Sequence, residues 1–170
     1  MIGSAGILPV HAPDFFSYKR HLPHWRQTGA TYFVTWRLER NLPPLSPNER
    51  SLVAAAIEHF NGDRYDLAAH VVMDDHVHVL LALRGGWRLD QVLHSWKSFT
   101  ARNILAVRGE EGPLWQSEYF DRIMRDDAEF LEKAQYILNN PRKRWPAVEE
   151  YPWAAFYIQH ARAECPRHPL

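Results

Sequence analysis

The amino-acid sequence predicts an α+β protein of the ferredoxin-like class: a β-α-β-β-α-β antiparallel sheet followed by an additional C-terminal helix. Two observations predict this class. Segments rich in β-branched and aromatic residues alternate with longer segments of helical periodicity. The second and third expected strands are separated by only two residues, which requires a tight hairpin and therefore antiparallel pairing. The length of 170 residues suits one compact domain.

The first half of the chain is expected to form a strand, a helix and a hairpin. Residues 31–38, TYFVTWRL, are β-branched and aromatic with partial alternation, which predicts a strand. A serine or an asparagine in the SPN run that follows can cap a helix over about 47–60. Two strands come next, over about 66–73 and 76–83, and they form the hairpin.

The second half is expected to contain two long helices around one strand. Residues 88–108 carry an apolar stripe at helical spacing, and residues 114–124 predict the last strand of the sheet. Asp126 begins a helix over 127–140 in a capping-box pattern, and Pro141 is expected to end this helix. The aromatic tail that follows can add a short helix.

We expect three parts along the chain: an irregular N-terminal arm over 1–27, the main domain over 28–145, and a tail over 146–170 that packs on it. The single cysteine, Cys165, cannot form an intramolecular disulfide, which is consistent with a reducing cytoplasm. The first residues lack the basic start of a signal peptide, and no apolar run approaches the roughly 18 residues that span a bilayer. A cytoplasmic location without membrane attachment is therefore expected.

Charge alone does not predict a partner. Lys plus Arg and Asp plus Glu each number 20, so the net charge is zero, which argues mildly against binding to nucleic acid. The distribution is uneven, because one segment holds five basic residues opposed only by Asp90: Arg84, Arg88, Lys97, Arg102 and Arg108. A neutral total can hide a basic face, and a mixed solvated surface is the equal alternative.

The sharpest chemical feature is a pair of histidines, His76 and His78, inside an apolar strand. Strand side chains alternate between faces, so both imidazoles project from one face, about 7 Å apart along the strand, while Val77 and Val79 project from the other. Two imidazoles on an apolar face are costly without partners, and a metal ion would serve both. Two packed histidines are the alternative, because this spacing recurs by chance. His70, in the preceding strand, is interpreted as a packed histidine.

The helix expected over 127–140 carries a tyrosine outside its apolar arc. Phe130, Ala134 and Ile137 lie within that arc, whereas Tyr136 and Asn140 lie one turn apart on the far side of the helix. This placement leaves the tyrosine hydroxyl available to a group outside the helix's own core contact. A plain exposed tyrosine is the alternative.

Several segments resemble one known family. The strand VVMDDHVHVLL is similar to the His-hydrophobe-His strand of the HUH single-strand DNA transposases, although two aspartates precede the first histidine where relatives often have proline and asparagine or aspartate. The run FDRIMRDDAEFLEKAQYILNNP resembles the C-terminal signature of the REP-associated tyrosine transposases, an IS200-like branch. Further similar segments are HLPHWRQTGATYFVTWRL, WKSFTARNI and LWQSEYFDR, and the resemblance covers about 21–157.

The resemblance implies a transposase that nicks and rejoins single-stranded hairpin DNA. Tyr136 would attack a DNA phosphate, the 3′-hydroxyl would leave, and the enzyme would hold the 5′-phosphate as a phosphotyrosine. His76, His78 and Asn140 would hold a divalent metal, with Asn140 where insertion-sequence relatives have a glutamine. Phosphate oxygens favour Mg²⁺ or Mn²⁺, whereas imidazoles alone would favour Zn²⁺, Ni²⁺ or Cu²⁺. The family acts as dimers or monomers, so both a monomer and a homodimer remain open.

Four basic residues are expected to assist DNA binding or to activate the tyrosine. Lys97, Arg102 and Arg108 are candidates for DNA phosphate contacts, with an exposed helix face as the alternative for each. Lys133, one turn before Tyr136, is expected to lie near the DNA and to favour the phenolate form of the tyrosine.

Two other functions remain open on the sequence. A non-cutting protein that recognises structured nucleic acid could use the same fold, but it would not need two histidines, a tyrosine and an amide in combination. A zinc hydrolase would need a third strong ligand, and the sequence has no His-Glu-x-x-His helix.

Overall fold

A computed structural model of the protein describes residues 7–8 and 30–157. The elements follow in the order β1 (Ile7–Leu8), β2 (Thr31–Leu38), α1 (Pro47–Glu58), β3 (Tyr65–Val72), β4 (His76–Leu83), α2 (Leu89–Arg108), β5 (Trp115–Ile123), α3 (Asp127–Arg144) and β6 (Ala154–Tyr157). From β2 to β5 this is the predicted β-α-β-β-α-β order. The α+β, ferredoxin-like class and the additional helix after it are confirmed.

The six strands that the structure describes belong to one antiparallel sheet with the order β1-β6-β3-β4-β2-β5. The first and third strands of the predicted unit, β2 and β4, lie side by side at its centre, and β3 and β5 flank them. The tail was expected to add a short helix, and this prediction is wrong. Its aromatic and alanine residues instead form β6, which pairs with the free edge of β3. Of the expected arm over 1–27, residues 7–8 form β1 beside β6, and the rest lies outside the described residues.

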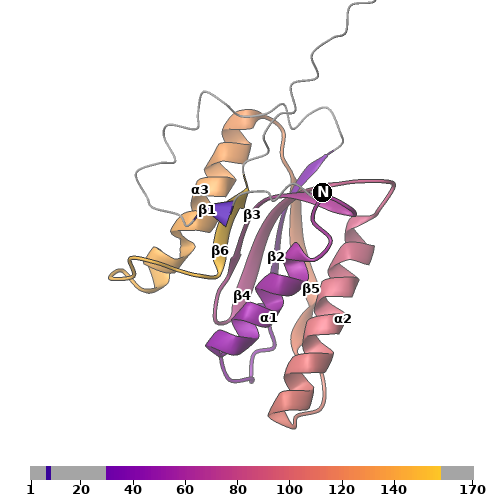
Figure 1. The fold of residues 1–170 in the computed structure, drawn as a ribbon, viewed down its shortest axis with the longest axis vertical. Coiled ribbons are helices and arrows are strands. Elements are labelled where there is room, and N and C mark those ends of the chain that lie inside the picture. Colours follow the sequence, from indigo (N-terminus) through magenta and orange to yellow (C-terminus); the bar gives the residue numbers. More distant parts are fainter. Residues whose placement is uncertain (1–6, 9–29, 158–170) are drawn as a thin grey trace, which may run out of the picture.

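The sheet has helices on both faces, as Figure 1 shows. On one face, α1 and α2 bury a large apolar core that includes Trp36, Val79 and Trp96. On the other face, α3 covers a smaller cluster that includes Phe33 and Ile137. Trp96 is 2% exposed and Trp115 is 5% exposed in this core, and Trp87 packs against it partly buried.

Helix α3 begins where the sequence predicts and ends later. The Asp126 carboxylate accepts a hydrogen bond from the backbone N–H of Glu129 at 2.8 Å, which is an N-terminal cap. The prediction that Pro141 ends the helix is wrong. Pro141 is buried within the helix, and its carbonyl accepts the N–H of Trp145 at 2.7 Å, so the helical pattern resumes after the missing N–H of the proline. Within the described ranges, none of the helices combines the length and the apolar character that crossing a membrane requires.

Candidate active site

The hairpin between β3 and β4 places the two motif histidines. The N–H of Met73 donates to the carbonyl of His76 at 2.8 Å and closes the turn, while the carbonyl of Asp75 accepts the N–H of Leu38 at 2.8 Å. Beyond the turn, the side chains of β4 alternate as predicted. Val77 enters the core under α1 and α2, and the two imidazoles project toward the face that carries α3. The centroids of the His76 and His78 rings lie 4.7 Å apart.

His76 is held between a carboxylate and an amide. Its Nδ1 lies 2.6 Å from Oδ1 of Asp75, and its Nε2 lies 3.2 Å from Oδ1 of Asn140 on α3. Burial alone would raise the pKa of Asp75, but the hydrogen bond with His76 and the nearby cations Arg144 and Arg37 lower it. The carboxylate therefore stays ionised and orients the imidazole, so that Nε2 faces the helix.

His78 is oriented by the neighbouring strand and keeps one nitrogen without a partner. Thr35 lies opposite it in β2, and Oγ1 of Thr35 lies 2.6 Å from Nδ1 of His78. Its Nε2 is buried and has no hydrogen-bond partner in the described part of the chain. Burial first, and then the positive charges of His76, Arg37 and Lys143, lower the pKa of His78 to about 3. The ring is therefore neutral at physiological pH, and with its proton on Nδ1 the Nε2 lone pair is available.

Helix α3 brings the tyrosine and the amide to the same place. Tyr136 is 37% exposed, and its ring centroid lies 5.2 Å from that of His78 and 6.1 Å from that of Phe33. No hydrogen bond of its hydroxyl is found among the residues described. Asn140 is only 6% exposed, so the expectation that it lies on the far side of the helix from the apolar arc is wrong. The helix presents this flank to the sheet, which directs both side chains toward the histidines.

The side chains of the site supply three ligands for a divalent metal only if the amide of Asn140 is one of them. Among the described residues, no group of three or more His, Cys, Asp or Glu side chains could hold a metal ion. The side chains of His76, His78 and Asn140 nevertheless adjoin one another, and they offer two imidazole nitrogens and one amide oxygen. The buried Nε2 of His78 without a partner is the feature that such an ion would satisfy.

Two lysines flank the tyrosine ring. Nζ of Lys133, which the sequence singled out, lies 5.9 Å from the centroid of the Tyr136 ring and 3.2 Å from Oε1 of Glu132. Nζ of Lys143 lies closer to that centroid, at 4.1 Å. Sequence reasoning placed Lys143 in a basic cluster with Arg142 and Arg144 but not beside Tyr136, because the helix was expected to stop at Pro141. The seven-residue spacing from Tyr136, which is two helical turns, is the signal that could have found it.

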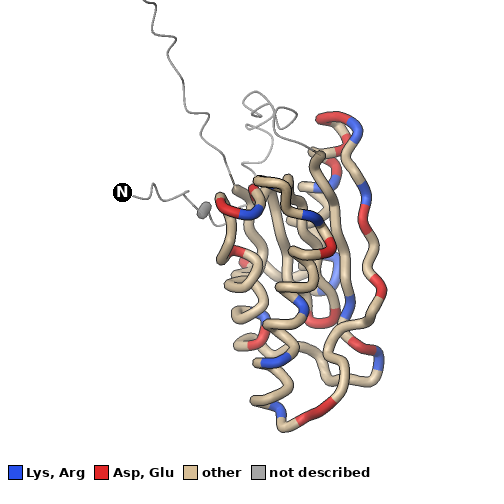
Figure 2. Tube along the Cα trace, turned by 90° about the vertical axis from the view of Figure 1, so that its right-hand side faces the viewer, with Lys and Arg blue, Asp and Glu red and all other residues tan. Residues whose placement is uncertain are grey.

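The other three basic residues lie on α2, which packs on the opposite face of the sheet. The ammonium group of Lys97 donates to the carbonyls of Gln116 and Ser117, and the Arg108 guanidinium donates to both carboxylate oxygens of Glu49. Arg102 is exposed. The structure does not bring these three near the histidines, and their role in DNA binding stays a prediction. In the view of Figure 2, basic and acidic positions are interspersed along the chain instead of forming one basic face.

The fold and the site together define an antiparallel-sheet protein in which a His-hydrophobe-His strand faces an accessible tyrosine on a following helix. This is the class that the resemblance in the sequence implies. The model of the family described as "Transposase IS200 like" matches residues 44–140, which include both histidines, Tyr136 and Asn140. The match spans more than half of the chain, and the chain belongs to the IS200-like transposase family.

The chain is also similar to two individual proteins. The REP-associated tyrosine transposase of Escherichia coli (strain K12) is 25% identical over 141 residues, which cover 81% of this chain and 83% of the relative. A solved structure of a REP-associated tyrosine transposase bound to a REP hairpin superposes with a TM-score of 0.61 at 21% identity, covering 78% of this chain and 82% of that one. The resemblance to this family is thereby confirmed, and the solved structure supports the same fold.

Proposed function

We propose that this transposase cleaves and rejoins single-stranded hairpin DNA, with Tyr136 as the nucleophile and a divalent metal beside it. One observation carries the proposal. A buried imidazole nitrogen of His78 has no partner, and the ring of an exposed tyrosine lies 5.2 Å from the same imidazole. A protein that only binds nucleic acid has no use for this combination, because a buried nitrogen without a partner destabilises the fold. The hairpin substrate is proposed because the solved relative holds a REP hairpin.

In this proposal Nε2 of His76, Nε2 of His78 and Oδ1 of Asn140 would hold the metal. When bound, Mg²⁺ or Mn²⁺ would withdraw negative charge from the scissile phosphate. Asp75 and Thr35 fix the two rings through Nδ1, which keeps both Nε2 atoms directed into the site. Asn140 is buried against His76 and is held there by α3, which makes the amide a rigid donor.

The chemical step uses the Tyr136 hydroxyl, which is free of hydrogen bonds among the described residues. Its oxygen forms a bond to phosphorus as the bond between phosphorus and the 3′-oxygen breaks. The phenol gives up its proton, and the departing 3′-oxygen takes one up to become a hydroxyl. Lys143 and Lys133, whose ammonium groups lie near the tyrosine ring, favour the phenolate electrostatically. Because the phosphotyrosine conserves the energy of the phosphodiester, the same step in reverse rejoins a strand.

The test is a search for the covalent adduct on a denaturing protein gel. The probe is a single-stranded hairpin from the repeats that flank the gene, labelled at its 3′ end and incubated with Mn²⁺ or Mg²⁺. Since the proposed adduct carries the fragment with the 5′-phosphate, the 3′ label should shift with the protein and a 5′ label should not. Tyr136→Phe should keep DNA binding and lose the adduct. Tyr119→Phe, at a tyrosine 38% exposed on β5, is the matched control and should behave like the wild type.

Three results of this assay would each exclude one part of the proposal. An adduct that survives in Tyr136→Phe would exclude this nucleophile. Hairpin binding without any adduct, across several metals and both labels, would favour the non-cutting protein on the same fold. An adduct that forms equally well after the metal has been removed with a chelator would exclude the proposed metal.

A further inference from the structure

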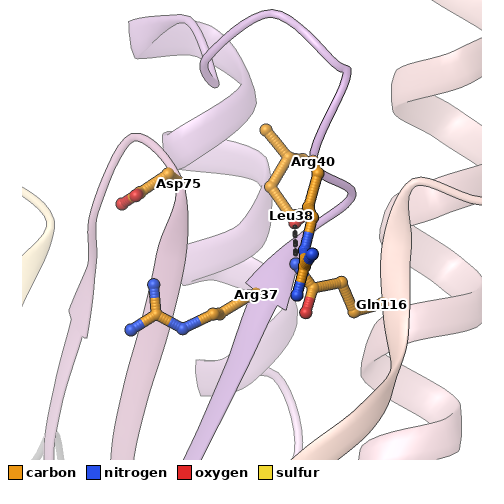
Figure 3. A pocket seen from close by; sticks show the side chains of 5 residues that line it. All are labelled: Arg37, Leu38, Arg40, Asp75 and Gln116. Atoms are coloured by element: carbon orange, nitrogen blue, oxygen red, sulfur yellow. Dashed lines mark hydrogen bonds between the residues drawn. The ribbon is translucent and has the colours of Figure 1, made fainter.

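An open pocket lies beside the histidine motif, where β2, β4 and β5 meet the loops at their ends. It has a volume of about 450 Å³ and is lined by Arg37, Leu38, Arg40, Asp75 and Gln116. Figure 3 shows the side chain of Arg37 reaching from β2 toward β4, which follows the turn that carries Asp75, with Arg40 and Gln116 together on the other side. Neither the two histidines nor Tyr136 lines this pocket, so its contents would differ from those of the proposed catalytic centre.

The pocket is nevertheless continuous with that centre. Arg37 is the direct cross-strand neighbour of His76, and its charge contributes to the lowered pKa values of Asp75 and His78. Asp75 both lines the pocket and bonds to Nδ1 of His76. A strand whose phosphate lies at the histidines would therefore have its neighbouring nucleotide within reach of the pocket.

The two arginines of the pocket differ from most of the other arginines that the structure describes. Within 30–157, no hydrogen bond or ion pair involves the guanidinium of Arg37 or Arg40. By contrast, a carboxylate engages Arg84, Arg88, Arg108, Arg122 and Arg144. Both pocket arginines are exposed, so their positive charges are available to a ligand. The overall charge of zero hides this local excess, because acidic partners neutralise other cations elsewhere.

The lining indicates the chemistry of the ligand. Two guanidinium groups and one carboxylate leave one net positive charge, and guanidinium groups recognise phosphate oxygens through paired N–H donors. Gln116 also lines the pocket, and it donates its amide N–H to the carbonyl of Leu38 at 2.9 Å, which fixes the side chain and leaves its Oε1 available as an acceptor. The volume falls within the range of small-molecule sites, and a single nucleotide fits such a space.

We propose that this pocket holds the unpaired nucleotide next to the scissile phosphate, with its phosphate bound by Arg37 and Arg40. The inference rests on the proposed function, since it takes single-stranded DNA as the substrate. It adds a second point of attachment, which fixes the strand on the sheet so that the next phosphate meets Tyr136.

The test measures binding without cleavage, so that it does not depend on chemistry. All variants are made in a Tyr136→Phe background without metal, and two oligonucleotides are compared: the hairpin with its unpaired flanks, and the hairpin stem and loop alone. Arg37→Ala and Arg40→Ala should each weaken binding of the flanked hairpin roughly tenfold, since each removes a charge-assisted hydrogen bond to phosphate. The slope of log K against log salt should become shallower by about 0.7 for each phosphate that the variant no longer binds. Binding of the stem and loop alone should not change.

Arg88→Ala is the matched control, because Arg88 is exposed, pairs with Asp90, and lies at the start of the helix on the opposite face. It should bind both oligonucleotides as the background protein does, and all variants should unfold at the same temperature. Equally weakened binding of both oligonucleotides would place the arginines on the stem and overturn the subsite. Unchanged binding would also overturn it, while adduct formation by the wild type would leave the proposed function standing. A wild type that binds neither oligonucleotide would overturn both proposals.

Discussion

The two faces of the sheet are built differently. On one face, α1 and α2 lie against each other and close a core in which Trp36 and Trp96 stack. On the other face, α3 packs against β3, β4 and β6, and beyond Phe33 no helix within the described residues covers the half formed by β2 and β5. Phe120 is 56% exposed there, and Arg37 is exposed as well. The closed face contributes most of the buried core, and the open face exposes sheet side chains beside the tyrosine.

Two buried histidines in neighbouring strands show what this difference means. His70 lies opposite Val79 and His78 lies opposite Val71, so the two rings project from opposite faces. On the closed face, Nδ1 of His70 lies 3.1 Å from the hydroxyl of Tyr157, and its Nε2 lies 3.7 Å from Glu58. On the open face, Nε2 of His78 has no partner in the described chain. The same residue type at similar burial is packed in one place and available for a ligand in the other.

The closed face is not perfectly satisfied, because Nε1 of Trp36 is also buried without a hydrogen-bond partner. An indole N–H cannot bind a cation, since it has no free lone pair, whereas an imidazole nitrogen can. The chemistry of the atom without a partner therefore distinguishes a packing imperfection from a ligand site.

The largest effect should appear when the two buried histidines compared above, His78 and His70, are each replaced by alanine in separate variants. His78→Ala should lower the rate of adduct formation on the order of a hundredfold or more, because it removes a proposed metal ligand. His70→Ala should keep that rate for the folded protein but lower the free energy of unfolding by about 2–4 kcal/mol, through a cavity and the removal of a partner for Tyr157. Mn²⁺ should raise the unfolding temperature of the His70 variant and not that of the His78 variant. If His70→Ala lost adduct formation and Mn²⁺ stabilisation while His78→Ala kept both, the ligand site would lie on the closed face and not on the open one.

The second effect is a dependence of stability on pH that arises on the closed face. Burial lowers the pKa of His70 to about 4, and the half-exposed carboxylate of Glu58, at 3.7 Å, does not offset it. The unfolded chain takes up a proton below about pH 6.5, whereas the native protein does so only near pH 4. The contribution of His70 is therefore complete above about pH 6.5 and is lost as the pH falls toward 4, by about 3 kcal/mol in total.

The measurement is urea unfolding of metal-free protein at pH 7.5 and at pH 4.5, for the wild type and His70→Gln. The variant should lose less stability between the two pH values, because glutamine does not titrate. His78 titrates in both proteins, so its contribution cancels in the comparison. An identical decrease in the two proteins would show that His70 is not the group responsible.

The third effect concerns two buried hydrogen bonds on the closed face, both made by one tyrosine hydroxyl. The hydroxyl of Tyr65 donates to the carbonyl of Ile57 at 2.6 Å and accepts the indole N–H of Trp96 at 3.0 Å. Tyr65→Phe should lower the free energy of unfolding by about 2 kcal/mol, since it leaves both partners buried and unsatisfied. Adduct formation should not change. Tyr119→Phe, at a more exposed position, should stay within about 0.5 kcal/mol of the wild type in urea unfolding.

The smallest effect concerns the uncovered half of the open face. Phe120 lies opposite Thr35 and has its ring centroid 6.5 Å from that of Phe33, on the side of the sheet that carries Tyr136. If an unpaired base stacks on it, Phe120→Ala should weaken binding of single-stranded DNA by about 1 kcal/mol, or roughly fivefold. Ile123→Ala is the control, because Ile123 is 51% exposed on the same strand and points to the other face. Equally weakened binding in the two variants would assign the effect to the strand and not to the open face.

The sequence by itself determined the features that depend on local periodicity. The alternation of a strand put His76 and His78 on one face, and helical spacing put Tyr136 and Asn140 on one flank of α3. These relations follow from backbone geometry, which is the same wherever the strand or helix lies in the molecule. The same reasoning failed at Pro141 and at the tail. There, burial of the proline and a free strand edge outweighed the local preferences.

Only the tertiary structure decided what these side chains meet. Thr35 and Arg37 lie beside the histidines because of the register between β2 and β4, and Lys143 reaches the tyrosine because α3 continues past its proline. The structure also separated α2, with Lys97, Arg102 and Arg108, from the site by the thickness of the sheet. Register and the choice of face for a helix are set by packing between segments distant in the chain, which no local pattern of residues encodes.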